Sequence, residues 1–215
     1  MTQAATQRPR KERTENAERR RSQLLAATQK SISTNGLAKT TLATVANEAG
    51  LSQGVAVFYF KSKTGLLEAA LRDLYSRYDA TWRAALKKAG DDPLDGLVAL
   101  IKADFDPKIC NPETLAVWFA FWGEQKFTPQ YAAVSSEFDA KRSAALRDIC
   151  ARLMPGASTA QAMRMADWID TQTDGYWQHL HVFPKTTRRK DAVRGTLEMV
   201  AQLIPEQAAR ILSRV

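Results

Sequence analysis

The sequence predicts an all-α protein, because apolar residues recur at helical spacing along most of its 215 residues. Prolines and glycines separate these stretches, and some follow a residue that favours a helix start, as Asn111 does before Pro112. No stretch alternates between apolar and polar residues as a half-buried strand does. The length allows a small N-terminal module and a larger helical body.

The chain begins with a basic segment, residues 1–13, that has no apolar run. We expect this segment to be disordered, with its Arg and Lys side chains able to lie along a phosphate backbone or reach a minor groove. A first helix is expected from about Thr14 to Thr34, and Asn35-Gly36 should end it because both residues tolerate positive φ. Its expected buried side consists of Leu24, Leu25, Thr28 and Ile32.

The stretch from Thr40 to Lys63 has the pattern of a helix-turn-helix. Leu42 to Ala49 carries apolar residues at i, i+3, i+4 and i+7, and Gly50 can end this short helix in a left-handed conformation. Ser52 suits the cap of a second short helix that runs to about Tyr59. We expect the complete DNA-binding module to cover residues 14–62.

The second of these short helices presents groups that suit contact with DNA. Polar groups near its start can reach base edges, whereas Tyr59 and Lys63 suit phosphates. A threonine hydroxyl at the start of the preceding helix is also well placed for a phosphate. The residues that we expect to contact DNA are Thr40, Thr41, Ser52, Gln53, Gly54, Val57, Phe58, Tyr59 and Lys63.

The run TT-x-x-x-VA-x-x-AGLS-x-G-x-x-x-FYFKSK-x-GLL, from Thr40 to Leu67, resembles the N-terminal domain of TetR-family transcriptional repressors. This resemblance covers about fifty residues and combines the glycine turn, the serine cap, the aromatic triplet and the following lysine. It implies a homodimer that binds a palindromic operator, with one recognition helix in each major groove. A three-helix structural cap whose aromatic residues are all core is the alternative interpretation.

The distribution of charge agrees with a DNA-binding N-terminus. The net charge of the chain is +8, and residues 1–72 hold twelve Lys/Arg against five Asp/Glu. The remaining residues are almost neutral, with nineteen Lys/Arg and eighteen Asp/Glu. Such an excess neutralises phosphates and makes binding dependent on salt.

The remainder of the chain, residues 63–215, is expected to form a helical body for ligand binding and dimerisation. A long helix should begin at Lys63 and end near Lys88, before the break at Gly90-Asp91-Asp92-Pro93. Proline and glycine breaks then separate the other helices. The expected ranges are 94–104, 112–127, 129–154, 158–182 and 186–203, followed by a short turn after Pro205.

The sequence contains no catalytic or metal-binding motif, so we expect neither an enzyme nor a cofactor. His179 and His181 lie two residues apart on one predicted helix and cannot chelate a single metal. Cys110 and Cys150 share no motif spacing, and no disulfide is expected. The absence of an apolar run long enough to span a membrane, and of a signal peptide, predicts a cytoplasmic protein.

Aromatic and acidic residues gather on helical faces in the predicted body. Trp118 and Trp122 share one face, and Asp174 and Trp177 share another. Aromatic faces attract cations and can form cages for quaternary ammonium groups, for which a carboxylate supplies the opposite charge. Aromatic residues at helical spacing also commonly fill a core, so both interpretations remain open at this point.

A second resemblance bears on the effector. The N-terminal run together with Phe105-Asp106, the segment AVWFAFW at 116–122 and DGYW at 174–177 is similar to the choline-responsive branch of the TetR family, which controls glycine-betaine synthesis. It implies choline or a related cation as the effector, although Gln125-Lys126 departs from the pattern. The candidate ligand-binding residues are Asp104, Phe105, Trp118, Trp122, Asp174 and Trp177.

The same resemblance implies that helices 158–182 and 186–203 pair with their copies in a dimer, as a four-helix bundle. The candidate interface residues are Trp168, Ile169, Val193, Leu197 and Val200. Two alternatives remain: a repressor of an efflux gene that responds to lipophilic cations, and a ligand-binding protein that does not read DNA.

Overall fold

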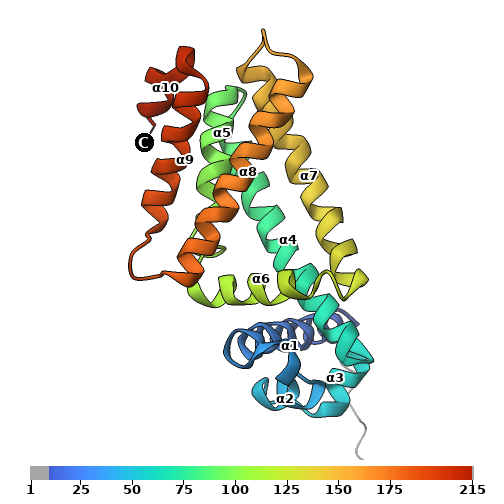
Figure 1. Cartoon of the computed structure of the whole chain (residues 1–215). Helices are drawn as coiled ribbons and strands as arrows, with labels where there is room; N and C mark the ends of the chain where they lie inside the picture. The colour runs from blue at the N-terminus through green and yellow to red at the C-terminus, as the bar shows by residue number, and fades with distance from the viewer. Residues whose placement is uncertain (1–9, 215) are drawn as a thin grey trace, which may run out of the picture. The chain divides into compact units, whose positions relative to one another are not determined.

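The computed structural model describes residues 10–214, with the side chains of residues 14–214 (Figure 1). The described residues are helical and contain no strand, so the predicted all-α class is confirmed. The chain forms two compact units that divide after Leu71, within a long helix.

The N-terminal unit contains three helices and the first turns of a fourth. They are α1 (Arg10–Lys39), α2 (Leu42–Glu48), α3 (Gln53–Phe60) and the start of α4 (Lys63–Ala89). Their apolar sides enclose one small core, and α2 and α3 pack against each other within it. The core residues are Leu24, Leu25, Ala27, Val45, Ala46, Ala56, Phe60, Leu66 and Ala70.

Helix α1 begins at Arg10, four residues before the expected start, so residues 10–13 are helical rather than disordered. The rest of the expected N-terminal arm, residues 1–9, lies outside the described residues. Gly36 has a φ of 78°, which interrupts the helical geometry at the position where the sequence predicts the end of the first helix. The last residues of α1 follow this kink.

The turn from α3 to α4 depends on a glycine. Lys61 has a φ of 64°, and the Ser62 amide donates a hydrogen bond to the Phe60 carbonyl at 2.7 Å. The Ser62 hydroxyl accepts from the Gly65 amide at 3.0 Å and so caps the new helix. A Cβ at Gly65 would overlap the Phe60 carbonyl oxygen, because the backbone folds back on itself here.

The first turns of α4 belong to the N-terminal unit, whereas the sequence analysis ends that module at residue 62. Leu66 and Ala70 pack in the core of the N-terminal unit, and Leu67 is also buried. Apolar periodicity marks the buried side of α4 but does not show which neighbours cover each turn, and this accounts for the difference.

The C-terminal unit contains the rest of α4 and the helices that follow (Figure 1). These are α5 (Pro93–Asp104), α6 (Pro112–Glu124), α7 (Pro129–Leu153), α8 (Thr159–Val182), α9 (Arg189–Leu203), the 3₁₀ turn η1 (Pro205–Gln207) and α10 (Ala208–Leu212). Helix α7 packs against α5 and α8, and α6 runs across the direction of these helices. Asn111 caps α6 and accepts a hydrogen bond from the Thr114 amide at 2.9 Å, so this helix starts where the sequence predicts.

No helix among the described residues is both long enough and apolar enough to cross a membrane.

Candidate DNA-binding and ligand sites

The exposed side of α3 carries four of the nine residues that are predicted to contact DNA. Gln53, Gly54, Val57 and Phe58 are exposed, whereas Ala56 and Phe60 turn into the core. The Phe58 side chain is 68% exposed, and Lys61 Nζ lies 5.2 Å from the centre of its ring. A large exposed aromatic residue beside a basic one is typical of a contact surface.

Residues at the edges of this surface already have structural partners. Lys63 Nζ donates a hydrogen bond to the Ala38 carbonyl at 2.7 Å, and Tyr59 is half-buried with its ring against Phe58. Thr41 caps α2 and accepts from the Thr44 amide at 3.1 Å. Ser52 occupies the cap position of α3 but its side chain makes no capping hydrogen bond.

Thr40 is fully buried, so the prediction that it contacts a phosphate is wrong. Its hydroxyl lies 2.9 Å from the Ser31 hydroxyl and donates to the Gly36 carbonyl at 3.0 Å. A buried hydroxyl needs such partners, and here they connect the end of α1 to the start of α2. Of two adjacent threonines, only Thr41 retains accessible surface.

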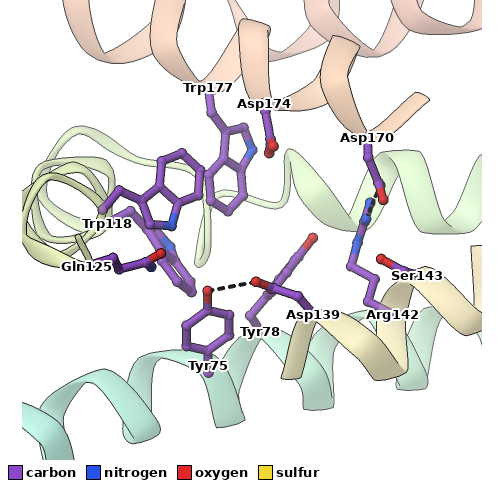
Figure 2. Close-up of a pocket in the computed structure, with 11 residues that line it drawn as sticks. Tyr75, Tyr78, Trp118, Gln125, Asp139, Arg142, Ser143, Asp170, Asp174 and Trp177 are labelled. Carbon is purple, nitrogen blue, oxygen red and sulfur yellow. Dashed lines mark hydrogen bonds and ion pairs between the residues drawn. The ribbon is translucent and has the colours of Figure 1, made fainter. Parts of the chain in front are cut away.

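The C-terminal unit encloses a cavity of about 340 Å³ between α4, α6, α7 and α8 (Figure 2). Aromatic side chains form one part of its wall, and charged and polar groups form the rest. The lining residues are Tyr75, Tyr78, Trp118, Trp122, Gln125, Asp139, Arg142, Ser143, Asp170, Asp174 and Trp177. Four of the six ligand-binding candidates from the sequence, Trp118, Trp122, Asp174 and Trp177, are among them.

The three tryptophans of the cavity wall pack on one another. Trp122 and Trp177 stack with ring centres 6.1 Å apart, and the Trp118 ring centre lies 5.7 Å from that of Trp177. Trp118 and Trp177 are almost fully buried, whereas Trp122 is half-buried. These tryptophans therefore contribute to the packed interior and also form part of the cavity wall.

Three aspartates line the cavity together with the aromatic residues. Asp139 comes from α7, and Asp170 and Asp174 come from α8 (Figure 2). Loss of hydration raises the pKa of Asp139 to about 6 and that of Asp174 to about 7, and the negative charge of Asp170 adds to both shifts. Among the described residues, neither Asp139 nor Asp174 forms an ion pair. These carboxylates would be stabilised by a bound cation.

An ion-pair network that includes the lining residues Tyr78, Arg142 and Asp170 connects the helices around the cavity. Asp104, at the end of α5, accepts hydrogen bonds from Tyr78 Oη and Arg142 Nη2, each at 2.6 Å. The other end of the Arg142 guanidinium donates to Asp170. Trp177 Nε1 donates to the Asp104 backbone carbonyl at 2.9 Å. One arginine thereby connects residues of α4, α5, α7 and α8.

Arg142 remains charged in this network. Burial alone would lower the pKa of its guanidinium, but Asp104, Tyr78 and Asp170 together hold it above the ordinary value. Because Arg142 already pairs with Asp104 and Asp170, it forms no ion pair with Asp139 or Asp174, and its positive charge only partly offsets their raised pKa values. Among the described residues that line the cavity, no other side chain is basic.

Asp104 and Phe105 do not line the cavity, although the sequence analysis places them among the ligand-binding residues. Both lie where α5 ends and both are buried. Asp104 holds Tyr78 and Arg142 in place, and the Phe105 ring packs edge to face on Tyr176 at 6.2 Å. The proximity of an acid and an aromatic residue in sequence does not show which direction they face.

Sequence reasoning missed the other lining residues, including Tyr75, Asp139 and Arg142. One signal was present in α8, where Asp170 and Asp174 are four residues apart on one face. Like charges at this spacing destabilise a helix, so they indicate a local need for negative charge. The residues of α7 carry no comparable signal, because only the packing of α7 against α8 brings them to the cavity.

The predicted dimer-interface residues fall into two groups. Ile169, Leu197 and Val200 are fully buried within the single chain, so their assignment to an interface is wrong. They pack inside the unit and have no surface to offer a partner. Trp168 is 47% exposed and Val193 is half-buried, so both retain surface on the outer sides of α8 and α9.

Within residues 14–214, no group of His, Cys, Asp and Glu side chains could hold a metal ion. Cys110 and Cys150 are both free and buried, and burial raises the pKa of each thiol to about 12.

The two units of the chain match two family descriptions. Residues 24–70 match "Bacterial regulatory proteins, tetR family", and residues 93–205 match "BetI-type transcriptional repressor, C-terminal". The helix-turn-helix unit and the helical body thus define a bacterial transcriptional regulator with a TetR-type DNA-binding domain. The expected resemblance to this family is confirmed.

Full-length relatives agree with the second match. The HTH-type transcriptional regulator BetI of Stenotrophomonas maltophilia is 35% identical over 158 residues, which cover 74% of this chain and 79% of that protein. BetI of Paraburkholderia xenovorans is 36% identical over 159 residues, covering 74% and 80%. The chain belongs to the BetI-type transcriptional repressors of the TetR family.

Solved structures show the same fold. A transcriptional regulator from Pseudomonas aeruginosa superposes with a TM-score of 0.80 at 23% identity, covering 90% of this chain and 94% of that one. A regulator from Saccharomonospora viridis, solved in complex with choline, superposes with a TM-score of 0.72 at 17% identity, covering 85% and 96%.

The Arg142 network generates a prediction about stability. We expect Arg142→Met to lower the free energy of unfolding by about 3–5 kcal/mol, because it leaves buried carboxylates without a partner. Urea unfolding followed by tryptophan fluorescence measures the change. Arg194→Met is the control, since the Arg194–Glu198 pair is exposed and should contribute less than about 1 kcal/mol. Equal losses in the two variants would contradict the role assigned to Arg142.

Proposed function

We propose that this BetI-type repressor binds a palindromic operator as a homodimer in the cytoplasm and is released by choline or a related small quaternary ammonium cation. On this proposal, the genes under its control serve choline and glycine-betaine metabolism. Ligand binding favours a conformation in which the spacing of the two DNA-binding domains does not match the spacing of the operator half-sites. The ligand shifts this equilibrium only as far as its affinities for the two conformations differ.

The observation that carries this proposal is that one cavity combines a tryptophan wall with aspartates that form no ion pair among the described residues. A quaternary ammonium group cannot donate conventional hydrogen bonds, so its recognition depends on aromatic faces and negative charge. Trp122 and Trp177 supply stacked faces, and Asp139 and Asp174 supply carboxylates without ion pairs. The names of the relatives and the choline complex of the Saccharomonospora viridis regulator support the same effector class.

The size of the cavity favours a small cation. A volume of about 340 Å³ is near the lower end of the range of about 300–1,000 Å³ seen for ligand pockets. Regulators that answer to large lipophilic cations need more space and more exposed apolar surface. The alternative of an efflux repressor predicts instead that large cationic dyes compete with choline for this cavity.

For DNA recognition we propose that the exposed side of α3 enters the major groove. Gln53, Gly54, Val57 and Phe58 face base edges, and Thr41, Ser52, Tyr59 and Lys63 lie along the phosphates. The exposure of Phe58 and the basic Lys61 beside it support this orientation. The dimer would form through the outer sides of α8 and α9, which include Trp168 and Val193.

This assignment separates base reading from phosphate binding. Gln53→Ala should relax base preference at one position of each half-site by about 1–3 kcal/mol, as read from selection on randomised operators. Lys63→Ala should weaken binding to all DNA sequences alike. It should also reduce the slope of log binding constant against log salt concentration by about one for each DNA-binding domain. Lys87→Ala, in the exposed last turn of α4, is the control and should change neither. An unaltered base preference in Gln53→Ala would remove this residue from the readers.

Release by the ligand is tested with fluorescence polarisation on DNA from the upstream region of the protein's own gene. Wild-type protein should bind tightly and dissociate when millimolar choline is added. Trp122→Ala should keep operator binding and lose at least tenfold in choline sensitivity, because it removes one stacked face of the cavity. Phe127→Ala, at a 73% exposed aromatic residue outside the cavity lining, should respond like wild type. Choline-insensitive binding by the wild type would refute the proposed effector.

The raised pKa values of the cavity aspartates predict a pH dependence. A cation binds the ionised carboxylates better, so its binding releases protons, and choline itself does not titrate in this range. With pKa values of about 6 for Asp139 and about 7 for Asp174, choline affinity should rise by up to about a hundredfold from pH 5.5 to pH 8, the limit reached if both carboxylates must be ionised. Titration calorimetry at several pH values measures the choline affinity. The double variant Asp139→Asn/Asp174→Asn should bind more weakly with a flat profile; a slope like that of wild type would contradict the assignment.

A further inference from the structure

Gln125 is a polar, uncharged residue of the cavity lining that belongs neither to the aromatic wall nor to the acidic cluster. It follows the last residue of α6 and shares one helix face with Trp118 and Trp122, at spacings i, i+4 and i+7. In the sequence, Gln125 departs from the choline-responsive pattern. Its side chain is half-buried and lines the cavity beside the tryptophans.

A hydrogen bond fixes the orientation of the Gln125 amide. Gln125 Nε2 donates to the Ser135 hydroxyl at 2.7 Å, and Ser135 on α7 is itself buried, with 4% exposure. This bond uses the nitrogen of the amide and leaves its oxygen, Oε1, as the accessible acceptor. Figure 2 shows the end of the Gln125 side chain turned toward the cavity next to Tyr75. Among the described residues, no group donates a hydrogen bond to Oε1.

The chemistry of Oε1 differs from that of the carboxylates in the cavity. Asp139, Asp170 and Asp174 carry charge and suit the ammonium group. Oε1 is neutral, so it contributes less to holding the cation but can accept a hydrogen bond from a hydroxyl. A ligand without a hydroxyl would leave this acceptor unpaired on closing the cavity, and a ligand with a carboxylate would face repulsion from Oε1 and from the aspartates.

We propose that Gln125 Oε1 accepts a hydrogen bond from a hydroxyl of the ligand, so that the cavity selects a quaternary ammonium alcohol over hydroxyl-free and carboxylated analogues. This inference rests on the proposed function and adds a specificity-determining residue to it. The ammonium group lies against the tryptophans and aspartates, and the hydroxyl is directed to the α6 end of the cavity. Ser135 acts as a positioning residue through its bond to the amide nitrogen.

Titration calorimetry on the full-length protein tests the inference with choline, ethyltrimethylammonium and glycine betaine. Ethyltrimethylammonium has the shape of choline without its hydroxyl, and glycine betaine carries a carboxylate in its place. Wild-type protein should bind choline about three- to tenfold tighter than ethyltrimethylammonium, as one hydrogen bond provides. It should bind glycine betaine at least tenfold more weakly than choline.

Gln125→Leu keeps the approximate size of the side chain and removes the acceptor. We expect it to reduce choline affinity about three- to tenfold and to leave ethyltrimethylammonium affinity unchanged, so that the ratio of the two falls to about one. Gln125→Met provides the same readout if the leucine variant is unstable. Gln130→Leu, at an exposed glutamine in the first turn of α7, is the control and should retain the wild-type ratio.

The outcomes distinguish this inference from the proposed function. If the wild-type ratio persists in Gln125→Leu, or if wild type binds choline and ethyltrimethylammonium equally, Gln125 does not read a hydroxyl although cation binding stands. Glycine betaine binding as tight as choline would also overturn the selectivity. If wild type binds neither cation, the proposed effector class is wrong and the inference falls with it.

Discussion

The C-terminal unit depends on the charge of one buried arginine. Arg142 satisfies Asp104 at the end of α5 and Asp170 on α8, while Tyr78 of α4 shares the Asp104 carboxylate. A buried ion pair of this kind adds little net stability compared with apolar packing, but removing one member is costly. Its effect is to fix the relative positions of the helices that carry the cavity wall. The shape of the cavity therefore depends on this network as much as on its apolar contacts.

The same network explains the chemistry of the cavity. Because Arg142 pairs with two other carboxylates, it only partly offsets the charge of Asp139 and Asp174, whose pKa values rise through lost hydration and repulsion from Asp170. The tryptophans of the cavity wall are held in place by packing on one another and by the bond from Trp177 Nε1 to the Asp104 carbonyl. A rigid aromatic wall and unpaired acids lower the cost of organising a cation site at the moment of binding.

Helix α4 contributes to both units of the chain. Its first turns supply Leu66 and Ala70 to the core of the DNA-binding unit, and later turns supply Tyr75 and Tyr78 to the cavity. A ligand that contacts Tyr75 and Tyr78 therefore acts on the helix that also completes the helix-turn-helix core. Gly65 permits the tight turn by which this helix leaves α3, so the start of α4 is fixed within the N-terminal unit. This arrangement offers a physical route for the response that we propose.

The sequence by itself determined the helical class, the helix-turn-helix and four of the cavity residues, because apolar periodicity, caps and turn glycines are local properties of the chain. Only the tertiary structure decided which sides of these helices meet. Thr40 and Thr41 are equivalent in sequence, yet one is buried and the other caps a helix. Ile169, Leu197 and Val200 fit an interface pattern but fill the core, and Asp139 and Arg142 reach the cavity because α7 packs on α8. A period of 3.6 residues shows that a helix has a buried side, whereas long-range packing selects what covers it.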